Sequence, residues 1–351
     1  MFGMSPMGIS SHKISLRKDL AAYLRPSANL SVYDRINHLR DFYQDYLKKN
    51  FPQEDSVLYK INAIWDTILE SFSLYSKGLC ADAVEVMYND LFSNLELNID
   101  VIHGCINGGL PLFRMRYSAD GERFSKKEMF HVPISLRHII KNERFSVTGM
   151  PMLYLASSAY ICWEEMGRKN FDNCNISSFH ALKDLRVLQI DPLWGDFKED
   201  MIYNYPLSLA CFLEVEHVDG AYKEEYIIPQ IFMQCILKYN HTHKETPISG
   251  VKYLSSRVMR DGVLFPIDNP GFECYNYALL ATEPYNEDGF SEVLIDSLYY
   301  SSPLIYGITR LVVQQKPVKS NNAENYENSA FRFMESQCEY HRIIEYCQEK
   351  K

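Results

Sequence analysis

In two short apolar stretches of the sequence, charged or hydroxyl side chains occupy every second position. In "LFRMRY", Arg114 and Arg116 alternate, so on a strand both project to one face. In "GVKYLSSR", Tyr253 and Ser255 alternate in the same way. Guanidinium groups bind phosphates and carboxylates through paired hydrogen bonds, and a hydroxyl can both donate and accept. The spacing therefore predicts two strands that each present polar groups on one face.

A third stretch, "RFSVTGMPMLYLASSAYICWEEMGR" at residues 144–168, begins with Arg144 and ends with two adjacent carboxylates. Neighbouring helical residues point about 100° apart, so Glu164 and Glu165 cannot share one environment. We expect one of them to face inward and the other to face solvent or to pair with a nearby Lys or Arg. A carboxylate close to a helix C-terminus is disfavoured by the helix dipole, which favours a functional reason for its presence.

Taken in order, these stretches resemble the RES domain, a family named for its Arg, Glu and Ser. The resemblance depends on "LFRMR", on an Arg-Phe turn that leads through Gly-x-Pro to "LYLASS", and on a Glu eleven residues after Tyr154. It also depends on "GVKYLSSR", which matches the family's Gly-x-x-Tyr-x-Ser-x-Arg, and "YIIPQIFMQCIL" with Gln230 is similar to the preceding helix of the family. The resemblance covers about residues 99–285.

Membership of this family would imply a fold similar to ADP-ribosyltransferases and cleavage of the nicotinamide–ribose bond of NAD. Those members that resemble the toxins of toxin–antitoxin pairs degrade NAD by hydrolysis or phosphorolysis, or transfer ADP-ribose to a protein. NAD would then be the substrate, with no metal expected, and an antitoxin-like protein would be a candidate partner. The family's functional positions fall on Arg114, Arg144, Tyr154, Glu165 and Ser255. The chain departs from the family at Glu143, where a Gly usually precedes the second Arg, and in the "FS" that replaces an Asn after it.

The implied chemistry gives each carried-over residue a role. Departure of nicotinamide leaves positive charge on the ribose, as in glycoside hydrolysis, and a fixed carboxylate at Glu165 would stabilise that charge. Arg114 and Arg144 would hold the diphosphate of NAD. Tyr154 would stack on the nicotinamide or the ribose, and Ser255 would donate to the ribose or the amide. The eleven-residue spacing selects Glu165, with Glu164 as the alternative.

Plainer structural roles compete with these assignments. We expect Arg116 and Tyr253 to assist substrate binding, but a strand Arg is more often solvated or part of a structural ion pair. Tyr154 is one of 25 Tyr and can be a core residue, and Ser255 can be only a strand hydroxyl with Ser256 beside it. At the level of function, the alternatives to an NAD-degrading enzyme are a protein ADP-ribosyltransferase of the same fold and a non-enzymatic binding module.

The surrounding pattern predicts an α+β protein. Residues 1–98 have apolar residues at helical spacing, with stripes on Val32 to Tyr46, Leu58 to Tyr75 and Val84 to Leu95. Beyond that point, short apolar runs broken by Gly, Pro, Asn and Asp indicate strands, with helices expected at 157–166 and 229–239. We expect three parts: a helical region at 1–98, an ADP-ribosyltransferase-like mixed β core at 99–316, and a polar linker with a C-terminal helix at 317–351.

Composition limits the class of partner and the compartment. A net charge of −9 without a basic block argues against binding to nucleic acid or to an anionic membrane. Nine Cys without a CxxC pair are typical of reduced thiols, and no apolar run is long enough to span a bilayer, so we expect a cytoplasmic protein. His217, His241 and His243 lack Cys or carboxylate neighbours at metal-ligand spacing. The N-terminal helices are candidates for homo-oligomer formation.

Overall fold

The computed structural model describes residues 20, 22–27, 29–51, 53–93, 103–190, 201–255, 257, 274–313 and 323–350. The chain divides into two compact units. The helical unit comprises residues 1–103, 142–147 and 188–248, and the sheet unit comprises 104–141, 148–187 and 249–351. This division differs from the predicted boundaries after 98 and 316. The difference arises because two later segments, 142–147 and 188–248, join the N-terminal helices, while the C-terminal helix belongs to the sheet unit.

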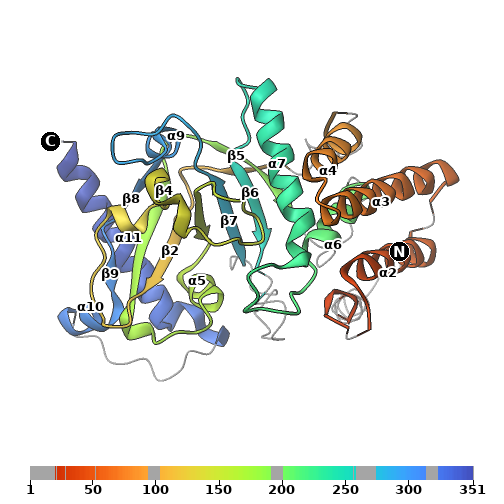
Figure 1. Ribbon diagram of the computed structural model, residues 1–351. Coiled ribbons are helices and arrows are strands. Elements are labelled where there is room, and N and C mark those ends of the chain that lie inside the picture. The colour runs from red at the N-terminus through yellow and green to blue at the C-terminus, as the bar shows by residue number, and fades with distance from the viewer. Residues whose placement is uncertain are drawn as a thin grey trace, which may run out of the picture. The chain divides into compact units, whose positions relative to one another are not determined.

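The helical unit confirms the predicted stripes (Figure 1). Its α-helices are α2 (Val32–Asn50), α3 (Asp55–Ser76), α4 (Cys80–Met87), α6 (Tyr205–Cys211) and α7 (Ile227–Thr242), and the 3-10 turn η6 is Glu224–Tyr226. The third predicted stripe continues from α4 into a π-helical segment, η1 (Tyr88–Ser93), and its last residue, Leu95, lies outside the described residues.

Local signals explain where α2 begins and which side it buries. Ser31 Oγ accepts from the Asp34 amide at 3.1 Å, and the Asp34 carboxylate accepts from the Ser31 amide, so a capping box forms. Ile36, Leu39 and Tyr43 are fully buried. The apolar face of the helix therefore supplies the core of this unit, as its spacing predicts.

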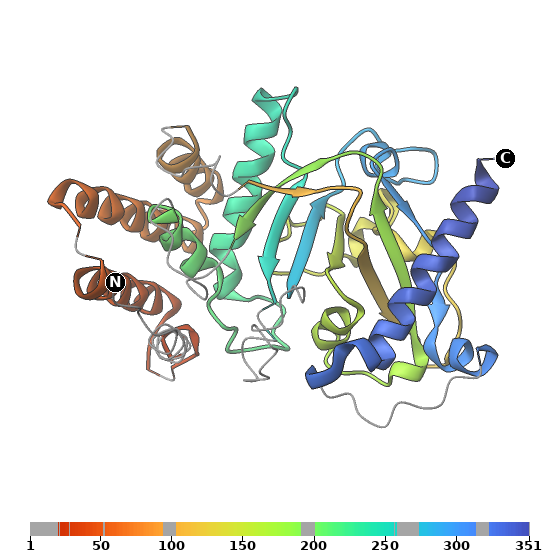
Figure 2. The same cartoon turned by 180° about the vertical axis from the view of Figure 1, so that it is seen from behind.

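Among the described residues, nine strands form one sheet in the order β1-β5-β6-β7-β3-β2-β4-β8, with β9 also paired to β4 (Figure 2). The strands are β1 (His103–Ile106), β2 (Leu112–Tyr117), β3 (Met152–Ala156), β4 (Cys174–Ala181), β5 (Leu185–Ile190), β6 (Gly250–Leu254), β7 (Tyr275–Leu280), β8 (Leu298–Tyr300) and β9 (Leu304–Ile305). The α-helices of the sheet unit are α5 (Ala159–Glu165), α9 (Glu292–Ile295), α10 (Tyr306–Val312) and α11 (Ala330–Glu349). Its short 3-10 segments are η2 (Lys127–Met129), η3 (Ile134–Ile139), η4 (Phe171–Asn173) and η7 (Ala323–Asn328).

The fold is therefore α+β, as the sequence predicts. Four of the predicted runs form strands, namely β2, β3, β6 and β7, and a fifth forms β5. A further apolar run, "GVLFPI", also predicts a strand but lies outside the described residues. The glycine-containing stretch "HGCINGG" at 103–109 begins with strand β1.

Both faces of the sheet are apolar, and each is covered by different elements. On one face, Phe113, Met115 and Ala156 pack with residues of α5 and α11. On the other, Leu112, Leu153 and residues of β7 pack around Phe130 and Phe290. The face under α5 and α11 is the one on which the candidate site is built, and Figure 2 shows α11 crossing the sheet there.

Strand β2 forms a long ladder with β4 and a short one with β3. It pairs with β4 from Leu112 to Tyr117, whereas its register with β3 is given by Phe113 opposite Ala156. Because the ladder between β2 and β3 is so short, the two strands separate beyond the pair of Phe113 and Ala156. The side chain of Arg114, the next residue of β2, links the two strands there, as described below.

Candidate functional site

Helix α5 carries both carboxylates of the third sequence stretch. It begins after Ser158, whose hydroxyl accepts from the Ile161 amide at 3.2 Å, and it ends at Glu165. Gly167 and Arg168 then adopt positive φ values of 75° and 57°, which turn the chain away from the helix axis. The predicted helix at 157–166 is thus confirmed, and Glu165 is its last residue.

The carboxylate of Glu165 is held by two donors from distant segments. The Ser255 hydroxyl and the Asn276 side-chain amide each donate to Glu165 Oε1 at 2.7 Å. The second oxygen, Oε2, lies 3.5 Å from Arg257 Nε. An ionised carboxylate suits this arrangement because its oxygens only accept hydrogen bonds. About a third of the Glu165 side chain, 33%, remains exposed, so the group is oriented without being enclosed.

Glu164 has a different and more enclosed environment. Its side chain is 3% exposed, Tyr160 Oη donates to it, and Arg168 Nε lies 2.8 Å from Oε2. The expectation that Glu164 pairs with a nearby basic residue is confirmed, and the alternative that it faces solvent is wrong. The reason is the left-handed turn after the helix, which returns Arg168 to the side of α5 on which Glu164 and Tyr160 lie.

The pairing of β6 with β7 explains why Ser255 and Asn276 reach the same oxygen. Tyr253 lies opposite Asn276, and the Ser255 amide continues the ladder by donating to the Cys274 carbonyl at 2.9 Å. Opposite residues of an antiparallel pair share a face, as do residues two apart on one strand. Tyr253, Ser255 and Asn276 therefore belong to one face, which agrees with the predicted alternation of Tyr253 and Ser255.

Gly250 allows β6 to approach β7 closely. Its φ is 155°, and a Cβ at this position would overlap the carbonyl oxygen of Ala278. The glycine of the Gly-x-x-Tyr-x-Ser motif thus has a physical reason, because any larger residue would separate the strands that carry Ser255 and Asn276.

The position of Ser255 suggests a second role beside the predicted one. It is fully buried, and its hydroxyl hydrogen is directed to Glu165. In this position the hydroxyl is placed to orient the carboxylate. A direct contact of Ser255 with a ribose or an amide stays a prediction of the resemblance.

Arg114 spans the point where β2 and β3 diverge. Its Nη1 donates to the Tyr154 carbonyl at 3.1 Å, and its buried Nε has no hydrogen-bond partner among the described residues. Burial lowers the pKa of Arg114 to about 10, so it stays protonated at neutral pH. Cys162 of α5 contacts this strand through a hydrogen bond from its thiol to the Phe113 carbonyl at 3.3 Å. Arg114 alternates with Phe113 and Met115, which pack under α5, so it projects from the opposite face of β2, the face of Leu112.

Arg116 and Tyr154 fit structural roles at least as well as ligand contacts. Arg116 Nη1 donates to the Glu128 carbonyl at 2.7 Å, and its guanidinium lies 4.3 Å from the centre of the Phe124 ring. This arrangement favours the structural alternative for Arg116. Tyr154 and Tyr253 are both half-buried, and Tyr154 supplies the carbonyl that Arg114 binds.

Arg144 belongs to the helical unit. Its Nη1 donates to the Cys211 carbonyl at 2.7 Å, and its guanidinium lies 5.0 Å from the centre of the Tyr226 ring. The neighbouring Glu143 carbonyl accepts from Gln230 at 3.0 Å. Within this unit, Arg144 and Gln230 fasten the 142–147 turn to the helices. For Arg144, which the resemblance marks as functional, this is a structural use.

Two contacts of Glu165 were absent from the predicted site. Asn276 was missed, although a single amide in the otherwise apolar strand "CYNYALLA" is a signal, because a buried amide needs partners. Arg257 stands at the last position of the quoted motif but was not selected. The position of Asn276 follows from the register of β6 and β7, which the sequence does not give.

Two properties of the described residues concern other classes of site. No group of three or more His, Cys, Asp or Glu within the described ranges is placed to hold a metal ion. None of the helices there combines the length and apolar character needed to cross a membrane.

Comparison with known proteins identifies a relative by sequence. The chain is 30% identical over 260 residues to the protein named "Putative toxin YopC" of Bacillus subtilis (strain 168). The match covers 67% of this chain and 54% of that protein, so the chain spans about half the length of this relative. No family model matches the chain. No solved structure matches it either.

Proposed function

We propose that the protein degrades NAD by cleaving the nicotinamide–ribose bond, as a glycohydrolase or phosphorylase, and that it acts as a toxin or defence effector by depleting NAD. The observation that carries the proposal is the contact between Glu165 and Ser255. These two residues of the RES-like pattern are 90 positions apart, yet they are hydrogen-bonded at 2.7 Å. A fixed and partly exposed carboxylate is the group that the proposed chemistry needs most.

The chemistry follows from where charge develops. As nicotinamide leaves, the ribose C1′ and ring oxygen become positively charged, and water or phosphate then attacks C1′. Glu165 supplies a negative charge, and Ser255 and Asn276 hold its carboxylate in a fixed orientation. Little reorganisation is therefore needed during the reaction. Arg257, which is partly exposed beside Oε2, is a candidate partner for the diphosphate.

The biological part of the proposal is supported by the relative. That protein bears the name "Putative toxin YopC", and the alignment covers two thirds of the present chain. Loss of NAD stops many redox reactions at once, so an enzyme of this kind would be toxic at low abundance. The resemblance to RES domains and the toxin name of the relative support the same proposal from different observations.

The deciding experiment measures nicotinamide release from NAD by the purified full chain, with and without phosphate. We expect release by the wild type, with ADP-ribose as product in water or its 1″-phosphate in the presence of phosphate. Glu165→Gln should lower the rate by at least about a hundredfold, the usual cost of removing one charge-stabilising group. Glu122→Gln, at an exposed Glu of the same unit, serves as the matched control.

The products also separate the remaining alternatives. ADP-ribose attached to a protein acceptor, with little free ADP-ribose, would assign a protein ADP-ribosyltransferase. If the wild type leaves NAD intact under both conditions and NAD does not raise its melting temperature, the site does not act on NAD, because a ligand bound by the folded state must stabilise it.

A further inference from the structure

The first turn of α5 is held by a buried acid of the C-terminal helix. Glu335 of α11 accepts from the amide of Ala159, the first residue of α5, at 2.7 Å. The side chain of Glu335 is 4% exposed. Helix α5 is thus held at both ends: Glu335 binds Ala159 at its start, and Ser255 and Asn276 bind Glu165 at its end.

Further groups complete the environment of Glu335. Tyr326 Oη donates to Oε1, and Arg332 Nη1 lies 3.5 Å from Oε2. Cys162 of α5 and Cys338 of α11 are the other titratable side chains that interact with it. Burial raises the pKa of Glu335 to about 7, although the hydrogen bonds from Tyr326 and Ala159 oppose this rise.

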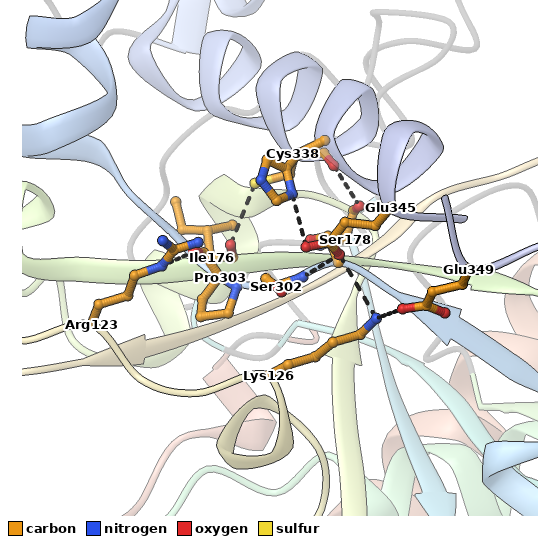
Figure 3. Close-up of polar contacts among 11 residues, drawn as sticks. Arg123, Lys126, Ile176, Ser178, Ser302, Pro303, Cys338, Glu345 and Glu349 are labelled. Atoms are coloured by element: carbon orange, nitrogen blue, oxygen red, sulfur yellow. Dashed lines mark hydrogen bonds and ion pairs between the residues drawn. The ribbon is translucent and has the colours of Figure 1, made fainter. Parts of the chain in front are cut away.

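Helix α11 is itself fixed to the sheet, as Figure 3 shows. The Ser178 hydroxyl of β4 donates to the Cys338 carbonyl at 3.1 Å, and the Cys338 thiol donates to the Ile176 carbonyl at 3.4 Å. Near the end of the helix, Glu349 lies 3.1 Å from Lys126. Because these contacts set the position of α11 on β4, they also set the position of Glu335.

We infer that Glu335 is a positioning residue through which the C-terminal helix places α5, and with it the carboxylate of Glu165. A helix of seven residues is too short to be stable by itself, so tertiary contacts must fix it. The hydrogen bond to Ala159 satisfies one of the free amides of the first turn and prevents that turn from fraying. The consequence for NAD cleavage rests on the proposed function, whereas the holding of α5 does not.

The test compares two substitutions of Glu335. Glu335→Gln retains an oxygen that accepts from Ala159, whereas Glu335→Met has a similar size but no acceptor. Glu339→Met is the matched control, since Glu339 lies one turn further along α11 and pairs with Arg342. Amide hydrogen exchange of residues 160–165 reports the holding of α5, and the kcat and KM of nicotinamide release report its consequence for Glu165.

We expect Glu335→Met to accelerate exchange in α5 by at least about tenfold, the factor for loss of a hydrogen bond to a charged group. Its kcat should fall while KM changes little, and Glu335→Gln should stay within about threefold of wild type on both measures. Unchanged exchange in Glu335→Met would overturn the inference, whether or not the protein acts on NAD. A wild type that releases no nicotinamide would refute the proposed function alone, because the exchange result does not use NAD.

A second measurement does not require the Met variant to fold. In full-length protein labelled with 15N-alanine, the Ala159 amide resonance should shift as pH is lowered from 8 to 6, because its acceptor becomes protonated. Glu335→Gln should abolish this titration. An Ala159 amide that does not respond to pH in the wild type would contradict the contact on which the inference depends.

Discussion

Ser255 Oγ and Glu165 Oε1 lie 2.7 Å apart and join a strand end to a helix end across 90 residues of sequence. The hydroxyl is fully buried, whereas the carboxylate is partly exposed. The serine therefore fixes the orientation of the Glu165 carboxylate, and the carboxylate itself is accessible to a ligand. This arrangement favours an orienting role for Ser255 over a direct contact with the substrate, and the two roles predict different kinetics.

Removing the Ser255 hydroxyl should affect the chemical step more than binding. We expect Ser255→Ala to lower kcat for nicotinamide release by about tenfold or more, the cost of an orienting hydrogen bond to a charged group, while KM stays nearly constant. Steady-state kinetics with NAD measures both constants. Ser336→Ala, which removes an exposed hydroxyl from α11, should leave them unchanged. A large rise in KM with an unchanged kcat would instead indicate that Ser255 contacts the substrate.

Substitutions of Asn276 test whether the negative charge on Glu165 Oε1 is important for activity. Its amide donates to Glu165 Oε1 at 2.7 Å, so Asn276→Asp would replace a donor by a like charge at that position. We expect this variant to lose more activity than Asn276→Ala, and to have a lower melting temperature. Activity in Asn276→Asp equal to that of Asn276→Ala would show that Asn276 does not act through the charge of Glu165.

Much of the fold could be predicted because its pattern is local. The apolar residues of α2 and α3 recur at helical spacing, and those of β2, β3, β6 and β7 form the short runs that are typical of strands. Strand β4, "CNISSFHA", gave no such signal, since it buries polar residues on the sheet. Asn175 bonds the main chain of Glu122 and Phe124, and Ser178 bonds that of Cys338. Their partners come from distant segments, so a single stretch of sequence cannot show that such a strand is buried.

The candidate site was predictable to the same extent. The spacing of the RES-like pattern selected Glu165 and Ser255, which the fold brings together. Asn276 and Glu335 could not be found in this way. The first depends on the register of β6 with β7, and the second on the docking of a helix outside the resemblance. Arg144 shows the converse, because its motif position is clear but its contacts within the helical unit are structural.

Gly250 should be sensitive to the smallest substitution. A Cβ there would overlap the Ala278 carbonyl oxygen, so Gly250→Ala must push β6 away from β7. We expect it to lower the free energy of unfolding by more than about 2 kcal/mol, in the range of overpacking and strain combined. Gly78→Ala, where φ is 84° but no atom lies within 4 Å of the Cβ, should cost only about 1 kcal/mol. Urea unfolding compares them, and equal costs would exclude the close approach as the cause.

Glu335 should give the protein a distinctive dependence of stability on pH. Its pKa is raised from 4.5 to about 7 in the folded state, chiefly by burial. The folded protein therefore favours the protonated form, so the contribution of this group to the free energy of unfolding is fully present below pH 4.5. It is lost as pH rises through the window from 4.5 to 7. The loss should amount to about 3 kcal/mol, from roughly 1.4 kcal/mol per pKa unit.

Glu335→Gln cannot titrate, so its free energy of unfolding should fall less than that of the wild type across the same window. Urea unfolding at pH 5, 6, 7 and 8 measures the difference between the two proteins, which cancels the titration of all other groups. Glu339→Gln, on the same helix but paired with Arg342, should remain parallel to the wild type. Parallel curves for the wild type and Glu335→Gln would mean that Glu335 is ionised in the folded protein throughout this window, and that the contacts from Tyr326 and Arg332 outweigh its burial.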